Sequence, residues 1–426
     1  MARYNLREIA TDALIEITEH GQFSHIYMKM VLDKYAYFEK NERAFLTRIV
    51  NGCVERKIEL DYIIMLYSKT PVSKMKPFIR TILRMGVYEI YYMDGIRAAA
   101  TCDEYVKLAK KRGFQGLSGF VNGVLRNVAR NSDRPLDYPD ISTRYSMPQW
   151  IVDKWISDYG FDKTAQICEA FLQEAKGLCI RINTALVKPD ELKRRLERYG
   201  IACALDEDIS EAAYISGFDS VTAIAEFFEG MFYIQDYSSM QVAHNCNIKT
   251  GYNIIDVCAA PGGKALHAAE IMQGTGHVQA RDLTDKKVAI IRENIDRQRA
   301  SNIDAIQWDA TKLDDSAIES ADVVIADLPC SGLGIIRKKP DIKYNESKEQ
   351  LDELCALQRN ILDTVCQYVK PGGTLLYSTC TINKDENELQ VADFIKRHQE
   401  FTVSFEKQLF PSEKHDGFYL CKLQKK

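Results

Sequence analysis

The sequence has no long hydrophobic run, no secretion signal and no regular cysteine spacing. No stretch of the 426 residues approaches the ~18 consecutive apolar residues of a membrane-spanning helix, so no membrane association is expected. The segment from Met1 to Glu8 lacks the apolar core of a signal peptide, which favours a cytoplasmic protein with reduced thiols. The twelve cysteines contain no C-x-x-C pair and the seven histidines are scattered, so no metal site is expected.

The composition is that of a globular protein, but its charge is unevenly distributed. Hydrophobic residues make up 46% and charged residues 27%, which excludes a fibre or a mainly disordered chain, and the length suits two or three domains. The first 131 residues hold 21 lysines and arginines against 14 acidic residues, whereas the remainder hold 35 against 46. A basic N-terminal region followed by an acidic remainder suggests a module that binds a polyanion, although two ordinary solvated surfaces could give the same counts.

Hydrophobic periodicity divides the chain into three domains. Residues 1–131 show apolar residues at helical spacing and no alternating strand pattern, which predicts an all-α domain. After a polar, proline-containing linker, residues 145–235 mix helix and strand, with a strand expected at 178–183 and a helix at 189–199. Residues 236–426 alternate strands and helices, which predicts an α/β domain with a doubly wound, Rossmann-like parallel sheet covered on both faces. Its expected strands are 252–257, 276–280, 303–307, 322–326 and 374–378, and its expected helices include 284–298 and 348–369.

A glycine-containing loop follows the first strand of the α/β domain and opens a helix. Such a loop leaves free backbone N–H groups at a helix N-terminus, where they can bind an anionic group. The loop is not a nucleotide-binding P-loop, because Cys258 and Ala265 occupy positions where that motif needs glycine and Ser or Thr. The candidate binding residues of this loop are Cys258, Ala259, Ala260, Pro261, Gly262, Gly263 and Lys264.

Two acidic residues follow the next two strands. Asp282 ends the second strand, 20 residues after Gly262, at a position from which a carboxylate can accept both ribose hydroxyls of a nucleoside. Asp309 follows the third strand, where it could accept the amino group of an adenine. Isolated carboxylates of this kind are more often helix caps, but their place in the strand order favours a nucleoside pocket.

Two cysteines lie at the ends of the fourth and fifth strands. Cys330 belongs to the segment Asp327-Leu328-Pro329-Cys330-Ser331-Gly332, and Cys380 ends Ser378-Thr379-Cys380. The first, fourth and fifth strands are neighbours in a doubly wound sheet, so both thiols should converge with the glycine loop on one crevice. A lone cysteine such as Cys168 is usually an inert buried residue. Two thiols beside a nucleoside pocket instead indicate covalent catalysis by a thiolate.

These motifs resemble those of a known enzyme family. Residues 232–426 are similar to the RNA cytosine-C5 methyltransferases of the Sun/Fmu family, which use S-adenosyl-L-methionine. The similarity lies in the loop from Asp256 to Lys264, the segment from Asp327 to Gly334, and Lys370-Pro371-Gly372-Gly373 leading to Cys380. Residues 6–130 resemble, more diffusely, the NusB RNA-binding fold. The chain departs from the family's pattern at Leu328, where alanine is usual, at Met147, where histidine is common, and at Trp308, where a small residue is usual.

The resemblance implies a reaction and a role for each candidate residue. Members of the family transfer a methyl group from S-adenosyl-L-methionine to C5 of a cytosine after a thiolate adds to C6, and the expected substrate is 16S ribosomal RNA. Cys380 would be the nucleophile, Asp327 would contact the N3 edge of the base, and Cys330 would assist the elimination. The glycine-loop residues together with Asp282, Asp309 and Asp327 would bind the cofactor. The protein is expected to be a monomer that binds small-subunit ribosomal RNA, either naked or in an assembly intermediate.

Three alternatives remain open from the sequence. The substrate could be a transfer RNA or another RNA, or the chain could be a catalytically degenerate RNA-binding factor. Loss of either motif cysteine would favour a degenerate factor, and both cysteines are present. A DNA cytosine methyltransferase would take its nucleophile from the Pro329-Cys330 motif and would not need Cys380.

Overall fold

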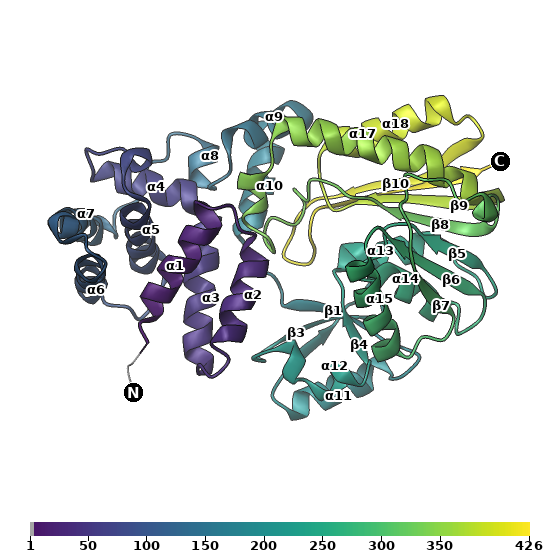
Figure 1. The fold of residues 1–426 in the computed structure, drawn as a ribbon, viewed down its shortest axis with the longest axis horizontal. Helices are drawn as coiled ribbons and strands as arrows, with labels where there is room; N and C mark the ends of the chain where they lie inside the picture. The colour runs from purple at the N-terminus through teal and green to yellow at the C-terminus, as the bar shows by residue number, and fades with distance from the viewer. Residues whose placement is uncertain (1–3) are drawn as a thin grey trace. The chain divides into compact units, whose positions relative to one another are not determined.

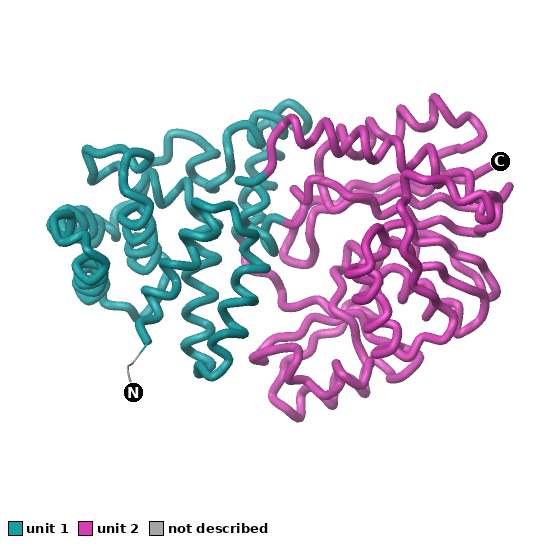
Figure 2. The backbone as a smooth tube through the Cα atoms, in the orientation of Figure 1, with its two compact units in different colours: residues 1–172, 336–345 teal, residues 173–335, 346–426 magenta. Residues whose placement is uncertain are grey.

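The computed structural model describes residues 4–426, which pack as two compact units. The first unit comprises the chain up to residue 172 together with residues 336–345, and the second comprises residues 173–335 and 346–426 (Figure 2). The chain therefore leaves the second unit once and returns to it. Within residues 4–426, no helix combines the length and the apolar character needed to cross a membrane.

The first unit is helical, as predicted for residues up to 131. Its first helix follows Asn5, whose side chain accepts the N–H groups of Arg7 and Glu8 and so caps the helix. Helix α5 begins with Pro77 at its first position and packs against α1, α3, α4, α6 and α7. The helices up to residue 172 are α1 (Leu6–Thr18), α2 (Ser24–Lys34), α3 (Lys40–Glu55), α4 (Lys57–Leu66), α5 (Pro77–Tyr92), α6 (Ala98–Lys111), α7 (Ser118–Asn131), α8 (Ile141–Arg144), α9 (Gln149–Tyr159) and α10 (Phe161–Leu172) (Figure 1).

A short segment from much later in the chain completes this helical unit. Residues 336–345, which include the short helix α16 (Ile342–Asn345), belong to it. Asp341 accepts the backbone N–H of Ser24 at 3.1 Å and so caps α2, which has no cap from its own N-terminal neighbour. Lys343 is buried and donates to the carbonyl oxygen of Glu55 at 2.7 Å. Because both pairings are long-range, the local sequence pattern did not reveal them.

The second unit begins with a small antiparallel sheet of order β2-β3-β1-β4. The predicted strand at 178–183 and helix at 189–199 are present as β1 (Leu178–Ile182) and α11 (Pro189–Arg198). Leu192 and Leu196 of α11 lie in one buried cluster with residues of β1, β2 and β3. The remaining elements of this region are β2 (Ala202–Leu205), β3 (Ala212–Ser216), α12 (Ala225–Phe228), β4 (Phe232–Ile234) and α13 (Tyr237–Asn245).

The larger sheet of the second unit has the order β10-β11-β9-β8-β5-β6-β7. Its strands are β5 (Asn253–Asp256), β6 (His277–Asp282), β7 (Ile303–Gln307), β8 (Ala321–Asp327), β9 (Val369–Thr379), β10 (Phe401–Leu409) and β11 (Phe418–Lys425). Strands β5 to β9 are parallel, and β9, β8 and β5 are neighbours, which confirms the predicted doubly wound order. Figure 1 shows α17 (Lys348–Val365) and α18 (Glu388–Arg397) on one face, and α14 (Gly263–Ile271) and α15 (Asp285–Gln298) on the other.

The sheet differs from the sequence expectation at its β9 edge. Strands β10 and β11 were not predicted, and they run antiparallel to their neighbours, so the sheet is mixed rather than wholly parallel. Apolar and polar residues alternate in β10 only from Phe401 to Glu406, and its interior is exposed almost throughout, so the strand signal is short.

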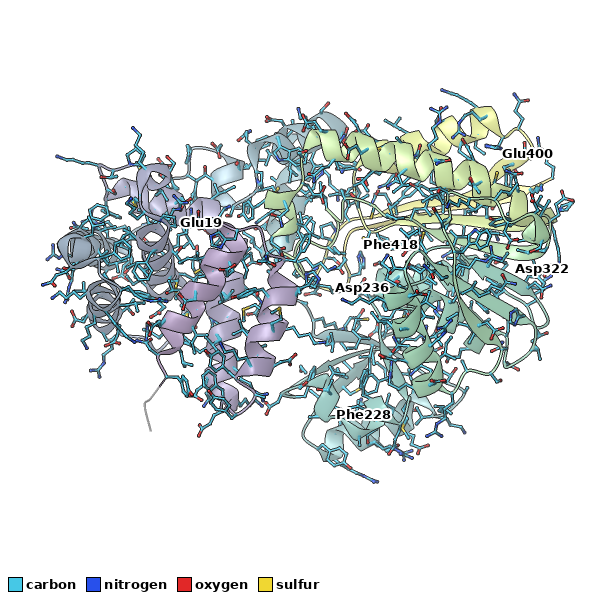
Figure 3. The ribbon with its side chains drawn as sticks, in the orientation of Figure 1. Glu19, Phe228, Asp236, Asp322, Glu400 and Phe418 are labelled. Carbon is cyan, nitrogen blue, oxygen red and sulfur yellow. The ribbon has the colours of Figure 1, made fainter. Side chains whose placement is uncertain are left out.

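Strand β9 also begins earlier than predicted and contains the Pro-Gly-Gly segment expected to precede it. The register shifts there: Ala321 pairs with Val369, whereas Val323 pairs with Thr374. Four residues of β9 thus bulge opposite Asp322 of β8, and a proline is tolerated at a bulge because no ladder hydrogen bond is lost there. Asp322, labelled in Figure 3, accepts a hydrogen bond from Lys370 Nζ at 2.9 Å. Helix α17 ends at Val365 rather than at the predicted residue 369, because a 3₁₀ turn leads into β9.

Candidate active site

The glycine loop connects β5 to α14 at the carboxyl edge of the larger sheet. Gly262 adopts a left-handed conformation, with φ of 107°, and caps α14, which begins at Gly263. A Cβ atom on Gly263 would lie 3.0 Å from the ring of Tyr233, so this close approach also favours glycine. Asn294 of α15 donates to the carbonyl oxygen of Pro261 at 3.0 Å and holds the loop in place. The N-terminus of α14 therefore lies where the sequence predicted an anion-binding turn.

Asp282, the last residue of β6, contacts this loop directly. Its Oδ2 atom accepts the N–H of Ala260 at 3.0 Å, and its Oδ1 atom accepts the N–H of Leu283 at 2.8 Å. Lys287 Nζ lies 3.1 Å from Oδ1. The carboxylate is only 3% exposed, so the protein already uses most of its acceptor capacity to shape the loop.

Asp309 follows β7 and is engaged in a local turn. Its Oδ1 atom accepts the hydroxyl of Thr311 at 2.6 Å and the N–H of the same residue at 3.0 Å. These hydrogen bonds lower the pKa of Asp309 below its usual value. This is the capping arrangement that an isolated carboxylate is expected to make. Its other oxygen, Oδ2, lies 4.0 Å from the ammonium of Lys312 in the same turn.

The ends of β8 and β9 meet the glycine loop through Asp327. Lys264 of α14 donates to Asp327 Oδ2 at 2.6 Å, and Ser378 of β9 donates to Asp327 Oδ1 at 2.8 Å. Burial alone would lower the pKa of Lys264, but the adjacent Asp327 carboxylate outweighs it and raises that pKa. The ring of Phe418, labelled in Figure 3, lies 5.7 Å from the Lys264 ammonium. Lys264 is thus a fixed positive charge beside the ends of β8 and β9.

The two motif cysteines lie side by side at these strand ends. The Sγ atoms of Cys330 and Cys380 are 3.3 Å apart, and both thiols are free and partly exposed. The hydrogen bond with Cys380, together with burial, raises the pKa of Cys330 well above its usual value. An electrostatic interaction with Cys380 makes a small contribution to the raised pKa of Lys264, so the two side chains are near each other. Burial also raises the pKa of Cys258 in the glycine loop.

A buried glutamate that was not assigned a role from the sequence joins the two cysteine loops. Glu386 has no exposed surface and accepts hydrogen bonds from the N–H and the hydroxyl of Ser331, at 2.8 and 2.6 Å. Asn383 and Gln358 donate to it at 2.8 and 3.2 Å. Glu386 follows Cys380 by six residues and contacts the neighbour of Cys330, so it fixes one thiol loop against the other.

A close approach of two backbone segments at Gly334 also holds the two cysteine loops together. Gly334 donates its N–H to the carbonyl oxygen of Cys380 at 3.0 Å and accepts the N–H of Gly417 at 2.8 Å. A Cβ atom on Gly334 would lie 2.1 Å from the carbonyl oxygen of Gly417 and 2.7 Å from that of Cys380. Only glycine fits between these two backbones, so the segment after Cys330 is anchored to the residue that carries the second thiol.

Asp256 is the last residue of β5 and lies near Lys264, Asp327 and Asp282. It is 1% exposed, and burial raises its pKa to about 7, against the opposing effect of the Lys264 charge. The structure therefore brings the glycine loop, Asp282, Asp327 and both cysteines to one edge of the sheet, and places Asp309 at the end of β7 on the same edge.

Comparisons with known proteins cover nearly the whole chain. Residues 244–424 match the model of the 16S rRNA methyltransferase RsmB/F family, and residues 4–130 match the NusB family. Residues 147–222 match the RsmF/B-like ferredoxin-like domain. Among solved structures, that of PH0851 has the same fold, with a TM-score of 0.82, 23% identity and 99% of each chain covered. The structure of NSun6 from Pyrococcus horikoshii with SFG covers 65% of this chain and 98% of its own at a TM-score of 0.60 and 21% identity.

Curated relatives match from end to end. The probable ribosomal RNA small subunit methyltransferase B of Bacillus subtilis (strain 168) is 34% identical, over 100% of both chains. The corresponding protein of Synechocystis sp. is 30% identical, over 98% of this chain and 99% of its own. The family resemblance inferred from the sequence motifs is confirmed. The chain belongs to the ribosomal RNA small subunit methyltransferase B family and is a methyltransferase.

Proposed function

We propose that this protein transfers a methyl group from S-adenosyl-L-methionine to C5 of a cytosine in small-subunit ribosomal RNA, through a covalent adduct. The observation that carries the proposal is the pair of thiols, 3.3 Å apart, beside the Lys264–Asp327 ion pair. The family membership of the chain supports the substrate class. The protein would act in the cytoplasm as a monomer, on naked RNA or on an assembly intermediate.

The residues around the glycine loop fit the cofactor. The N-terminus of α14 can receive a carboxylate group, and the remaining acceptor position of Asp282 can receive a ribose hydroxyl. Oδ2 of Asp309 would receive an amino group of the base in place of its long contact with the exposed Lys312. When bound, S-adenosyl-L-methionine supplies the electrophilic methyl group that the activated C5 carbon takes up.

The thiols would perform the covalent steps. C5 of cytosine is a weak nucleophile, so the Cys380 thiolate adds to C6 and moves the electron pair of the C5–C6 double bond towards C5. After methylation, a base removes the proton from C5, the double bond forms again, and the C6–S bond breaks to return its electrons to Cys380. Once the Cys380 sulfur is bound to C6, its hydrogen bond and charge no longer raise the pKa of Cys330, so Cys330 releases its proton to water and then takes the proton from C5.

The neighbours of Cys380 offer a source for its activation, which the sequence did not indicate. The Cys330 thiol has a raised pKa and stays protonated, so its S–H can donate to a thiolate at Cys380. The Lys264 ammonium adds a favourable charge interaction. Asp327 is held by Lys264 and Ser378 in an orientation suited to the polar edge of the base.

Single cysteine variants test the mechanism. The assay uses small-subunit ribosomal RNA from cells that lack the protein, and Cys355→Ala serves as a control because its thiol is also partly exposed. Cys380→Ala should lower turnover by at least ~10⁴-fold, about 5.5 kcal/mol of barrier, and form no complex on a denaturing gel. Cys330→Ala should accumulate a denaturation-resistant protein–RNA complex while multiple turnover collapses. The double variant should behave like Cys380→Ala, because no adduct forms to be trapped.

Two outcomes would contradict this assignment. An adduct in Cys380→Ala and none in Cys330→Ala would reverse the roles and bring the protein closer to the DNA cytosine enzymes. Normal turnover in both single variants would exclude the covalent mechanism. Mass spectrometry of the modified RNA locates the methyl group, and modification of transfer RNA alone would contradict the proposed substrate.

A further inference from the structure

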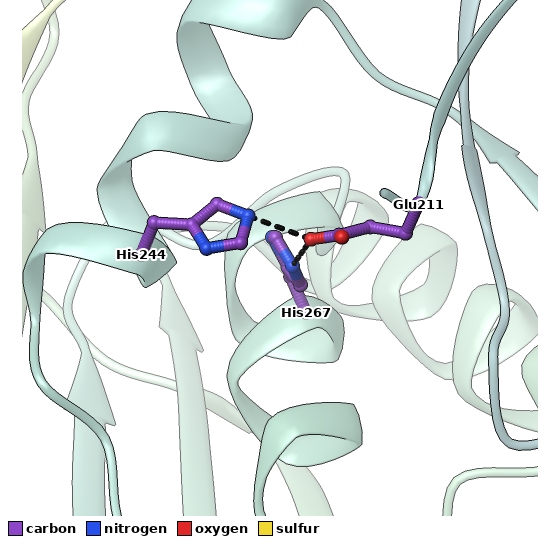
Figure 4. A group of neighbouring side chains, drawn as sticks. All are labelled: Glu211, His244 and His267. Carbon is purple, nitrogen blue, oxygen red and sulfur yellow. Dashed lines mark hydrogen bonds and ion pairs between the residues drawn. The ribbon is translucent and has the colours of Figure 1, made fainter. Parts of the chain in front are cut away.

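Three side chains with metal-binding chemistry converge in the second unit, away from the two thiols. Glu211 immediately precedes β3, His244 lies in the last turn of α13, and His267 lies in α14 (Figure 4). His244 Nε2 is 2.6 Å and His267 Nε2 is 3.1 Å from the same oxygen, Glu211 Oε1. One candidate ligand atom from each residue lies within 4.8 Å of the others. The proposed methyl transfer uses none of these groups.

The surrounding protein holds the carboxylate in this orientation. The hydroxyl of Ser210 donates to the other oxygen, Glu211 Oε2, at 2.9 Å. The backbone carbonyl of Glu211 accepts the N–H of Ile182 in β1 at 2.7 Å. Oε1 is therefore turned towards the two imidazoles. Hydrogen bonds of this kind, behind the ligand atom, orient carboxylate ligands in metal sites.

The charges around the cluster favour a cation. Arg181 Nε lies 3.4 Å from Glu270, so these two charges offset each other and the Glu211 carboxylate remains as the negative group of the cluster. Imidazole nitrogens and an ionised carboxylate are groups that bind metals.

His267 is buried and makes a single polar contact. The residue is 1% exposed, and its Nδ1 atom has no hydrogen-bond partner among residues 4–426. Its Nε2 atom contacts Glu211 Oε1, the oxygen that His244 also approaches. The two imidazoles therefore share one carboxylate oxygen, which brings the three candidate ligand atoms together.

We propose that Glu211, His244 and His267 form a binding site for a divalent transition metal, with zinc as the ion that fits best. Two histidines and one glutamate are a ligand set that zinc accepts in tetrahedral geometry, with a fourth position left for water. The three residues line an open cavity together with Asn247 and Glu270, which leaves room for that water. This site could not be predicted from the sequence, because its three residues lie far apart in the chain and follow no metal-binding spacing.

A metal ion here would join three elements of the second unit. Helix α14 carries the glycine loop at its first residue and His267 in its second turn. The ion would link α14 to α13 and to the start of β3, and would stabilise the folded state over the unfolded chain. Its role is structural support of the helix behind the glycine loop.

Metal titration of the full-length chain tests the proposal. Protein without an affinity tag is stripped with a chelator and titrated separately with Zn²⁺ and Co²⁺. Native mass spectrometry counts bound Zn²⁺, and the visible absorption of Co²⁺ reports four-coordinate binding. The wild type should bind one ion per chain and unfold at a higher temperature with Zn²⁺ than without it.

The chain offers matched variants for this titration. His244→Ala removes a ligand that is 39% exposed, and Glu211→Gln removes the charge while it keeps the size of the side chain. His277→Ala is the control, because His277 is 40% exposed and also lies beside a carboxylate, Asp304, at 3.5 Å. Loss of a partner behind a ligand costs 10- to 100-fold in affinity, so loss of a ligand should cost at least ~100-fold. Metal affinity should fall in both site variants and remain unchanged in His277→Ala.

Three results would overturn the proposal. The first is the absence of stoichiometric binding in the wild type, which would mean that Glu211, His244 and His267 only form hydrogen bonds with one another. The second is equal affinity in the wild type and in both site variants. The third is an intense near-ultraviolet sulfur-to-cobalt band, which would place the ion on cysteines. Circular dichroism of the metal-free variants establishes that they are folded. If His244→Ala is unstable, the metal affinity of Glu211→Gln provides the test.

Discussion

Asp282 shows how a single carboxylate can serve both the protein and a ligand. It fixes Ala260 and Leu283 through their N–H groups, yet it stands where the strand order places a ribose contact. We expect Asp282→Ala to weaken S-adenosyl-L-methionine binding by ~30- to 100-fold, or about 2–3 kcal/mol, because a charged acceptor is lost and the loop is released. Calorimetry measures the affinity. Asp304→Ala, at an exposed position of β7, is the control, and equal affinities in the two variants would remove Asp282 from the site.

The buried carboxyl group of Asp256 makes the stability of the protein depend on pH. Its pKa rises from 3.8 to about 7 because it is buried, so between these values the folded state holds a proton that the unfolded state has lost. The free energy of unfolding should therefore fall by a few kcal/mol as the pH rises from about 4 to 7, through this group alone. Asp256→Asn should abolish that part of the fall.

Urea unfolding of the cofactor-free protein at pH 4, 6 and 8 measures this effect. The stability of Asp256→Asn relative to the wild type should increase with pH and level off above pH 7. The exposed control Asp304→Asn should show no such trend. A constant difference between Asp256→Asn and the wild type at all three pH values would contradict the raised pKa.

At the scale of elements, the two thiol loops depend on the close approach at Gly334. Gly334→Ala would push the Cβ atom into the carbonyl oxygens of Gly417 and Cys380, so the thiol loops must separate. We expect turnover to fall on the order of 100-fold, because small displacements of reacting groups are costly, while cofactor affinity is unchanged. Gly123→Ala is the control: nothing lies within 4 Å of its added carbon, and the mid-helix change should stabilise α7 by about 0.5–1 kcal/mol. Full activity in Gly334→Ala would show that the approach is not needed.

The sequence predicted those elements whose pattern is local. Strands β5 to β8 and helix α15 were predicted within a few residues, because each carries its own apolar run and ends in a turn or a cap. The convergence of Cys330 and Cys380 followed from strand order alone. Glu386 and Gly334 could not be given their roles, because these depend on distances between loops rather than on spacing in the chain. Strand β10 was also missed, because its apolar alternation at Phe401, Val403 and Phe405 is short and largely exposed.

At the scale of the whole molecule, the basic charge of the first unit suggests an RNA contact. Lys69, Lys74 and Lys76 are exposed between α4 and α5. If these lysines contact phosphates of single-stranded RNA, each neutralised phosphate contributes ~0.7 to the slope of the logarithm of the RNA association constant against the logarithm of the salt concentration. Replacing all three lysines by glutamine should therefore reduce the steepness of that slope by about 2. Filter binding across a salt series measures the slope.

A matched variant separates this contact from the loss of overall charge. It carries the same substitution at three exposed lysines of the second unit, Lys249, Lys396 and Lys407. The slope should change less in this variant than in the first. Equal slopes in both variants would mean that the loop between α4 and α5 is not the RNA contact.

The return of the chain to the first unit sets an order for protein synthesis. Ser24 and Glu55 leave the ribosome early, but their partners Asp341 and Lys343 follow only after strands β1 to β8 have been translated. Until residue 345 emerges, the nascent helical unit lacks the cap of α2 and the donor to Glu55. The first part of the chain to be made is thus completed by one of the later parts, and translation that stops before residue 345 releases a helical unit without its final segment.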